Sequence, residues 1–158
     1  MVKISIALID RRIERPEIAF PSEGASGAVV EFFGVVRGRE GGKPIVALDY
    51  ESYRAMARKE LERVAEEVAR LGLCHEFVLI HRVGMVPVGE PSLYLRVAAE
   101  RRGTAFRIAE EAIQKLKADV PIWKTAVASP SQETLAEVAG EGTPSTMDGS
   151  RRGRTSDD

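Results

Sequence analysis

The sequence predicts an α+β fold in which two helices pack on an antiparallel or mixed β-sheet. Two stretches repeat apolar residues at helical spacing, and six shorter runs are rich in β-branched or aromatic residues. In chain order these segments read β-β-β-α-β-β-α-β. Two helices set among runs of strands are typical of an α+β arrangement.

Three strands are expected before the first helix, at 2–9, 27–37 and 45–51. The connection between the first two contains prolines and a glycine, and we expect it to be a loop with at most one short helical turn. Side chains alternate between the two faces of a strand. This alternation places Arg37 at the end of its strand, on the face that carries Glu31.

A glycine-rich segment, 38–44, joins the second and third strands. It lacks the glycine spacing of a phosphate-binding P-loop, and its lysine is followed by proline instead of Ser or Thr. The segment is therefore expected to be a flexible hairpin loop that can fold over a neighbouring site.

The first helix is expected to begin after Ser52, a suitable N-cap residue, and to end at Gly72. The second helix follows Thr104 and is stopped by Pro121. Both are amphipathic, as expected for helices packed on a sheet. Their apolar stripes are Ala57, Leu61, Val64, Ala65, Val68 and Leu71 in the first, and Ala105, Phe106, Ala109, Ala112, Ile113 and Leu116 in the second.

Three further strands are expected at 74–83, 92–100 and 122–128, with a turn region between the first two. These elements form one domain over 1–139, in which a short helix follows the last strand. The remaining segment, 140–158, is rich in Gly, Ser, Thr and charged residues, so we expect it to be disordered.

The composition excludes several classes of protein. The formal net charge is −1 although 30% of the residues are charged, which argues against a general nucleic-acid or membrane-surface binder. The single cysteine, Cys74, excludes an intrachain disulfide and a multi-cysteine zinc site, and strand-core packing explains it better than a nucleophile does. No apolar run approaches the roughly 20 residues of a membrane span, and no leader pattern is present. We expect a cytoplasmic protein without a metal or a resident cofactor.

Lys117 is the first candidate for chemistry. It stands at the edge of the second helix's apolar stripe, one residue past Leu116. A lysine half-drawn into an apolar wall is desolvated, which lowers its pKa and suits acid–base or nucleophilic chemistry. The alternative is a lysine in the last helical turn, where the helix dipole favours a cation and the stem covers apolar neighbours.

Basic residues gather around this helix. From Arg101 to Lys124 the chain has six basic and three acidic residues. Arg101 and Arg102 precede the N-terminus of the helix, where free N–H groups favour an anion. If these residues meet Arg37 and Lys117, they form an anion pocket with one partly buried lysine. Solvated arginines in a loop are the alternative.

Several stretches occur in the order and spacing of one protein family and cover about residues 2–128. They are GAVVEFFGVVRG (27–38), LDYE (48–51), HRVG (81–84), VGE (88–90), TAF (104–106) and LKADVPIWK (116–124). In this combination the chain resembles the large, catalytic subunit of molybdopterin synthase. The resemblance implies an α/β-hammerhead-like core with a small additional β lobe.

The resemblance also implies an activity and partners. Members of that family add two sulfurs to cyclic pyranopterin monophosphate and form the molybdopterin dithiolene, a step of molybdenum cofactor biosynthesis. Each sulfur arrives as the thiocarboxylate at the Gly-Gly tail of a ubiquitin-like small subunit. The large subunits form a homodimer, and with two small subunits the assembly is a heterotetramer. Because the sulfur arrives in trans, the large subunit needs no catalytic cysteine.

The resemblance assigns site residues by position. Lys117 matches the central catalytic lysine, and Lys124 matches the second pocket lysine. Arg37 matches the arginine at the strand end, and Arg102 matches the arginine on the substrate's phosphate side. We therefore expect Lys117 and Lys124 to be catalytic, and both lysines to bind substrate together with Arg37, Arg101 and Arg102.

The chain departs from the family pattern twice. The family usually has His-Arg where this chain has Arg101-Arg102, and an arginine cannot shuttle protons near neutral pH. The family also places a basic residue and a glutamate after the second lysine, where this chain has Thr125 and Ala126. Two alternatives therefore stay open. One is a relative that binds the carrier or a pterin phosphate without turnover, and the other is a generic anion-binding domain.

Overall fold

The computed structural model describes residues 1–21 and 24–130 and confirms the α+β class. Both predicted helices and all six predicted strands are present, and two short strands are additional. In chain order the elements are β1 (Lys3–Ile9), β2 (Ala28–Val35), β3 (Arg39–Glu40), β4 (Lys43–Ser52), α1 (Arg54–Ala69), β5 (Cys74–Arg82), β6 (Gly84–Pro87), β7 (Pro91–Ala99), α2 (Arg102–Asp119) and β8 (Ile122–Ala128).

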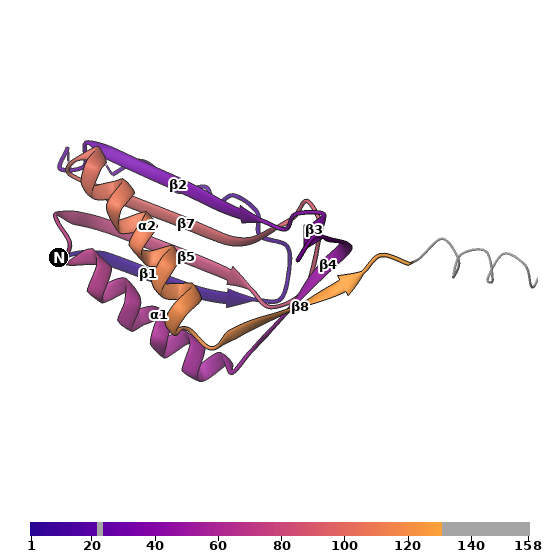
Figure 1. Ribbon diagram of the computed structural model, residues 1–158. Coiled ribbons are helices and arrows are strands. Elements are labelled where there is room, and N and C mark those ends of the chain that lie inside the picture. The colour runs from indigo at the N-terminus through magenta and orange to yellow at the C-terminus, as the bar shows by residue number, and fades with distance from the viewer. Residues whose placement is uncertain (22–23, 131–158) are drawn as a thin grey trace, which may run out of the picture.

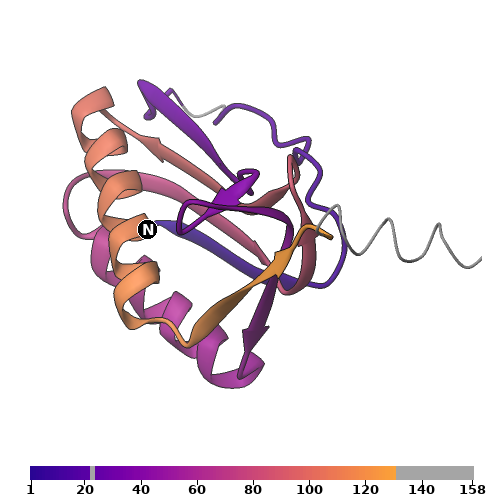
Figure 2. The ribbon, with the colours of Figure 1, turned by 45° about the vertical axis from the view of Figure 1, so that its right-hand side comes forward.

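The larger sheet has the strand order β1-β5-β7-β2. β1 runs parallel to β5, whereas β7 is antiparallel to both β5 and β2, so the sheet is mixed as expected. The two helices lie side by side and cover the same face of this sheet (Figure 1). The view in Figure 2 separates the helix layer from the sheet layer.

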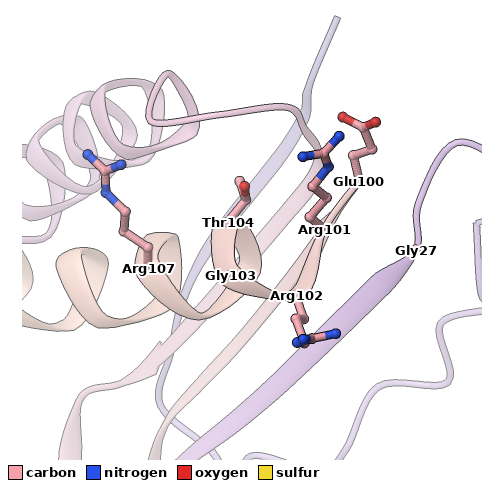
Figure 3. Close-up of a pocket in the computed structure, with 7 residues that line it drawn as sticks. All are labelled: Gly27, Glu100, Arg101, Arg102, Gly103, Thr104 and Arg107. Atoms are coloured by element: carbon pink, nitrogen blue, oxygen red, sulfur yellow. The ribbon is translucent and has the colours of Figure 1, made fainter.

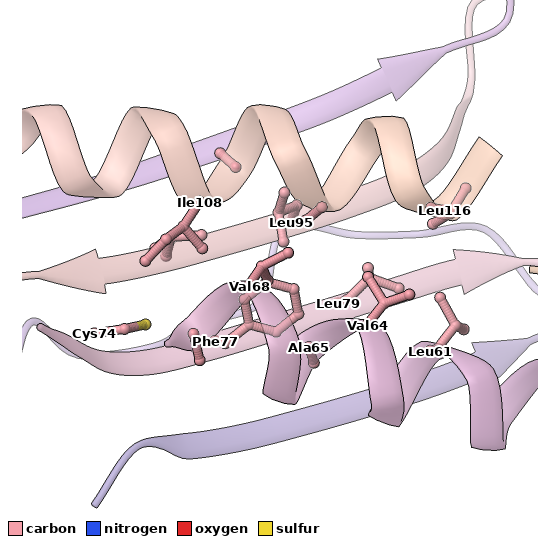
Figure 4. Packing of buried hydrophobic residues seen from close by; sticks show 14 of the residues in the cluster. Leu61, Val64, Ala65, Val68, Cys74, Phe77, Leu79, Leu95, Ile108 and Leu116 are labelled. Carbon is pink, nitrogen blue, oxygen red and sulfur yellow. The ribbon is translucent and has the colours of Figure 1, made fainter. Parts of the chain in front are cut away.

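The main core lies between the helices and the larger sheet (Figure 4). The predicted stripe of α1 is buried from Ala57 to Val68, and Ile108 and Ala112 of α2 are fully buried opposite it. Phe77 and other side chains of β5 and β7 fill the space between the layers. Burial of this apolar surface fixes the positions of α2 and of the strands beside it.

The opposite face of the larger sheet contains a buried ion-pair network. The guanidinium of Arg96 on β7 donates to Glu76 at 2.9 Å and to the Ala19 carbonyl at 3.0 Å. Glu31 of β2 accepts hydrogen bonds from Tyr94 and from Arg15. These contacts bind the irregular segment after β1 across the sheet, and its described residues form no helical turn.

The smaller sheet is built around β4. β3, β6 and β8 each pair with β4 in antiparallel orientation. β8 follows α2 directly, because Val120 is already extended and Pro121 cannot continue a helix. The chain therefore passes from the C-terminal end of α2 straight into the smaller sheet.

Three details of the sequence-based expectation are wrong. The N-cap of α1 is Tyr53 without a side-chain cap, and the hydroxyl of Ser52 is buried without a hydrogen-bond partner. β6 lies in the region expected to be only a turn, and β3 lies within the predicted hairpin loop. Short strands of two to four residues are too brief to show a periodicity in the sequence.

Within residues 1–21 and 24–130, no helix is long and apolar enough to cross a membrane. The predicted disordered tail, 140–158, lies outside the described residues. The predicted short helix after β8 falls largely outside them as well.

Candidate functional site

The two sheets and the C-terminal end of α2 enclose a cleft of about 550 Å³. Three of the predicted site residues line it together: Arg37, Lys117 and Lys124. They come from the end of β2, from the last turn of α2 and from β8. Its other lining residues are Phe32, Gly34, Val35, Val36, Glu40, Leu48, Tyr50, His81, Ser92, Leu93, Ile113, Leu116 and Ile122.

Lys117 is held at the rim of the cleft by the end of α2. Its neighbour Leu116 is buried in the core, and the N–H of Val120 donates to the Leu116 carbonyl at 3.3 Å to close the last turn. Lys117 itself is exposed. The expectation of a partly buried lysine is therefore wrong for the single chain, because the apolar stripe stops one residue before it. A bound ligand or partner would have to supply the missing burial.

Lys124 contacts a carboxylate that the sequence analysis did not single out. Its Nζ lies 2.6 Å from Oε1 of Glu40, which is carried by β3. The hydrogen bond from Lys124 lowers the pKa of Glu40, and the positive charge of Arg37 contributes in the same direction. Glu40 and Lys124 are 84 residues apart in sequence, so no local pattern could have paired them.

Arg37 lies two residues past the end of β2, where side chains no longer alternate between two sheet faces. The register with β7 shifts between Gly34 and Val35, with Ser92 of β7 as the extra residue. Arg37 lines the cleft, whereas Glu31 contacts Tyr94 and Arg15 on the opposite face of the larger sheet. The prediction that the two share a face is wrong.

The floor of the cleft contains polar groups from three strands. The Tyr50 hydroxyl and Ser92 Oγ are 3.2 Å apart, and Ser92 donates to the Gly34 carbonyl at 3.4 Å. His81 packs edge-on against the Tyr50 ring, with centroids 5.2 Å apart. Its Nδ1 lies 2.7 Å from the Arg82 carbonyl, so Nδ1 carries the proton. Burial lowers the pKa of His81, which keeps the imidazole neutral.

Arg101 and Arg102 lie at the opposite end of α2, in a separate open pocket of about 760 Å³. Arg107 and Glu100 line the same pocket, and the arginine side chains splay apart (Figure 3). Arg102 and Lys117 are 15 residues apart on α2, and at 1.5 Å per residue the helix separates them by about 23 Å. The expectation that these arginines share one pocket with Lys117 is therefore wrong within a single chain.

The backbone near this second pocket is tightly packed. A Cβ on Gly27 would lie 2.5 Å from the Glu100 carbonyl oxygen, to which the Gly27 N–H donates at 3.2 Å. Cys74, paired with Ala99 at the same end of the sheet, is buried, and its burial raises the thiol pKa to about 11. This confirms the core interpretation of Cys74.

In the described part of the chain, no group of three His, Cys, Asp or Glu residues could hold a metal ion. The cleft is basic and partly apolar, and its charged groups are Arg37, Lys117, Lys124 and Glu40. Such a site can bind anions, and its lysines can exchange protons with a bound reactant.

Comparison with known proteins identifies related chains. Residues 4–119 match the family model described as MoaE protein. A molybdopterin synthase catalytic subunit of Sclerotinia sclerotiorum is 32% identical over 116 residues, which are 73% of this chain and 58% of that protein. The human protein of the same description is 35% identical over 98 residues, 62% of this chain and 52% of its own length. The chain thus spans little more than half the length of these curated relatives.

Solved structures agree with the fold. The crystal structure of molybdopterin synthase from Staphylococcus aureus has a TM-score of 0.70 and 28% identity, and the match covers 78% of this chain and 91% of that chain. A complex of subunits 1 and 2 of molybdopterin-converting factor from Helicobacter pylori has a TM-score of 0.59 and 20% identity, with coverage of 78% and 89%. At that identity the second likeness concerns the fold alone. The family model covers most of the described chain, and the chain belongs to the MoaE protein family.

Proposed function

We propose that this chain is the catalytic subunit of a molybdopterin synthase. It transfers sulfur from the C-terminal thiocarboxylate of a ubiquitin-like small subunit to cyclic pyranopterin monophosphate and so forms the molybdopterin dithiolene. The single observation that supports this function most strongly is the convergence of Arg37, Lys117 and Lys124 on one cleft of a MoaE fold.

The cleft suits a reaction between two anionic partners. The carrier tail ends in a thiocarboxylate and the pterin carries a phosphate, so both are attracted by three cationic side chains. Lys117 and Lys124 both line the cleft, where the thiocarboxylate sulfur would form a bond to a side-chain carbon of the pterin as that carbon loses its oxygen substituent. Water would then cleave the acyl C–S bond, which leaves the sulfur on the pterin and releases the carrier tail as a carboxylate. Arg37 and Lys124 would hold the negative charge that develops in this step.

Lys117 is proposed to move the proton. Its ammonium is exposed in the free chain, and a bound carrier tail would cover it. Once covered, the lysine would be held against the bound reactants with water excluded, which is the arrangement that a proton-transferring group needs. The free chain would then lack this arrangement, and the assembled complex would have it.

Arg101 and Arg102 need a second protomer to take part. They are about 23 Å from Lys117 along α2, which is longer than a small pterin can bridge. In a homodimer, the arginines of one protomer can close the cleft of the other. We propose this arrangement because it lets all five predicted residues, Arg37, Arg101, Arg102, Lys117 and Lys124, contact one substrate.

A second function is favoured by the two departures from the family pattern. Arg101 cannot shuttle a proton, and Thr125 and Ala126 provide no carboxylate after Lys124. These changes leave anion binding intact while removing groups that could assist turnover. The chain would then bind the carrier or a pterin phosphate without forming product.

One experiment separates the two functions. The purified chain is mixed with thiocarboxylated carrier and cyclic pyranopterin monophosphate, and the dithiolene product is measured by mass spectrometry. The control uses the same carrier with an ordinary carboxylate, which can bind but has no sulfur to give. Product that depends on the thiocarboxylate supports the synthase. Carrier binding without product would reject it in favour of the binding protein.

A further inference from the structure

A short hairpin places a carboxylate inside the basic cleft. β3 consists of Arg39 and Glu40, and Glu40 pairs with Lys43 across a two-residue turn. The turn residues Gly41 and Gly42 have φ angles of +56° and +78°, a conformation that glycine adopts without strain. The turn therefore fixes the register of the hairpin and the position of Glu40.

The carboxylate of Glu40 forms an ion pair with the ammonium of Lys124. The two charged groups are 2.6 Å apart, and Arg37 also acts on the Glu40 carboxylate. Among the described residues that line the cleft, Glu40 is the one carboxylate, and it faces a set of cationic side chains. In the free chain, this carboxylate therefore sits where an incoming anion would contact Lys124.

We propose that Glu40 is a built-in competitor for the anion position at Lys124 and thereby sets how strongly the cleft binds anionic ligands. A ligand that carries a phosphate or a carboxylate must displace Glu40 before it pairs with Lys124. The inference rests on the proposed function only for the premise that an anion binds at this position.

The contact can be released without unfolding the hairpin. The backbone of the hairpin base is held by the Ile45 N–H, which donates to the Gly38 carbonyl at 3.1 Å. The side chains of Glu40 and Lys124 remain 31% and 50% exposed, so each can rotate into water. Solvated ion pairs of this kind are weak, and their loss changes an equilibrium by roughly two- to fivefold.

Trp123 is a fluorophore close to the cleft, although its side chain does not line it. It is the one tryptophan of the chain, it is adjacent to Lys124, and it packs edge-on against Tyr53 with centroids 5.4 Å apart. Its fluorescence can be followed while inorganic phosphate is added to the full chain. Isothermal titration calorimetry gives the same dissociation constant independently of the fluorophore.

The test compares Glu40→Gln with a matched control. Glu67 forms a similar pair with Lys115, 2.8 Å apart, outside the residues that line the cleft. Both E40Q and E67Q change the net charge by the same amount. We expect E40Q to bind phosphate about two- to fivefold more tightly than the unmodified chain, and E67Q to bind it unchanged. Adding Lys124→Gln to E40Q should remove the gain.

Each other outcome overturns the proposal. Equal or weaker phosphate binding by E40Q would mean that Glu40 only positions Lys124. An equal gain in phosphate affinity in E67Q would mean that the effect comes from the change in net charge alone. A lack of phosphate binding in both E40Q and the unmodified chain would mean that no anion binds at Lys124. Because the assay uses no carrier and no pterin, loss of dithiolene synthesis with the expected phosphate result would reject only the proposed function.

Discussion

The two ends of α2 have similar charge but different surroundings. At the C-terminal end, Lys117 opens onto a cleft whose walls come from both sheets. At the N-terminal end, Arg101 and Arg102 stand in an open pocket lined mainly by the residues of one turn. Free N–H groups and the helix dipole favour an anion at this second end, and the part of the chain that the structure describes leaves it open.

The difference shows that charge alone does not make a reaction site. An acid–base group acts when it is held against a reactant, and only the C-terminal end has walls that can hold a reactant against a lysine. The N-terminal end of α2 has the positive charges of Arg101 and Arg102 in an open pocket, which suits the binding and orientation of a phosphate. Chemistry is therefore expected at one end and recognition at the other.

The largest expected effect is the loss of Lys117. Lys117→Ala should reduce dithiolene formation by at least about 100-fold, because a positioned acid–base group contributes that much or more. Circular dichroism should remain as in the unmodified chain, since Lys117 is exposed. Lys115→Ala, on the same helix and paired with Glu67, is the control. Wild-type-like synthesis by K117A would show that the cleft end is not the reaction site.

A mixing experiment tests whether the two ends act together across a dimer. K117A and Arg102→Ala should each be strongly impaired alone. If Arg102 serves the partner's cleft, a mixed dimer contains one site with both residues intact, so a random mixture should regain about a quarter of the activity. Activity is measured as product per total chain after co-expression. An inactive mixture, despite heterodimers detected by native mass spectrometry, would contradict the trans arrangement.

The sequence was sufficient to predict both helices and the six longer strands, and to name three residues of the cleft. Long periodic segments such as α1 and α2 are dictated by local patterns of burial, and their order already indicates an α+β fold. The lysines at 117 and 124 and the arginine at 37 could be named because the resemblance marks them by position. None of this required knowledge of three-dimensional contacts.

The remainder depended on long-range packing. β2 ends at Val35, two residues before Arg37, so alternation counted along the sequence does not give the side on which Arg37 lies. Glu40 meets Lys124 only when β3 and β8 have both paired with β4. Arg102 and Lys117 are close in sequence, but an 18-residue helix holds them apart. Closeness in sequence therefore did not bring Arg102 and Lys117 together, and a long separation in sequence did not keep Glu40 and Lys124 apart.

A smaller effect concerns the histidine in the floor of the cleft. Burial lowers the pKa of His81 in the folded chain, so the unfolded chain binds its proton more readily. The contribution of His81 to the free energy of unfolding is therefore fully present above the ordinary histidine pKa of about 6.5. This contribution is lost as the pH falls below that value. His81→Gln should flatten this dependence, by at most about 1.4 kcal/mol per pH unit.

Urea denaturation between about pH 7.5 and pH 5 measures the slope of stability against pH. His75→Gln removes the other histidine of the chain, at the opposite end of β5, and serves as the control. The slope should decrease in H81Q relative to H75Q. An unchanged slope in H81Q would show that His81 does not become protonated on unfolding in this range, and hence that the cleft floor is wetter than its burial indicates.

Substitution of the arginines is expected to have no effect on the reactivity of the nearby cysteine. Burial raises the pKa of the Cys74 thiol to about 11, so little thiolate exists near neutral pH despite the arginines at the same end of the sheet. At about pH 8, Cys74 should react with a disulfide reagent roughly 100-fold more slowly than an unburied thiol, and at the ordinary rate after unfolding in urea. Arg101→Ala and R102A should leave the slow rate unchanged. A fast reaction that slows in these variants would mean that the arginine end activates a nucleophile, and the division between a reacting end and a binding end would no longer hold.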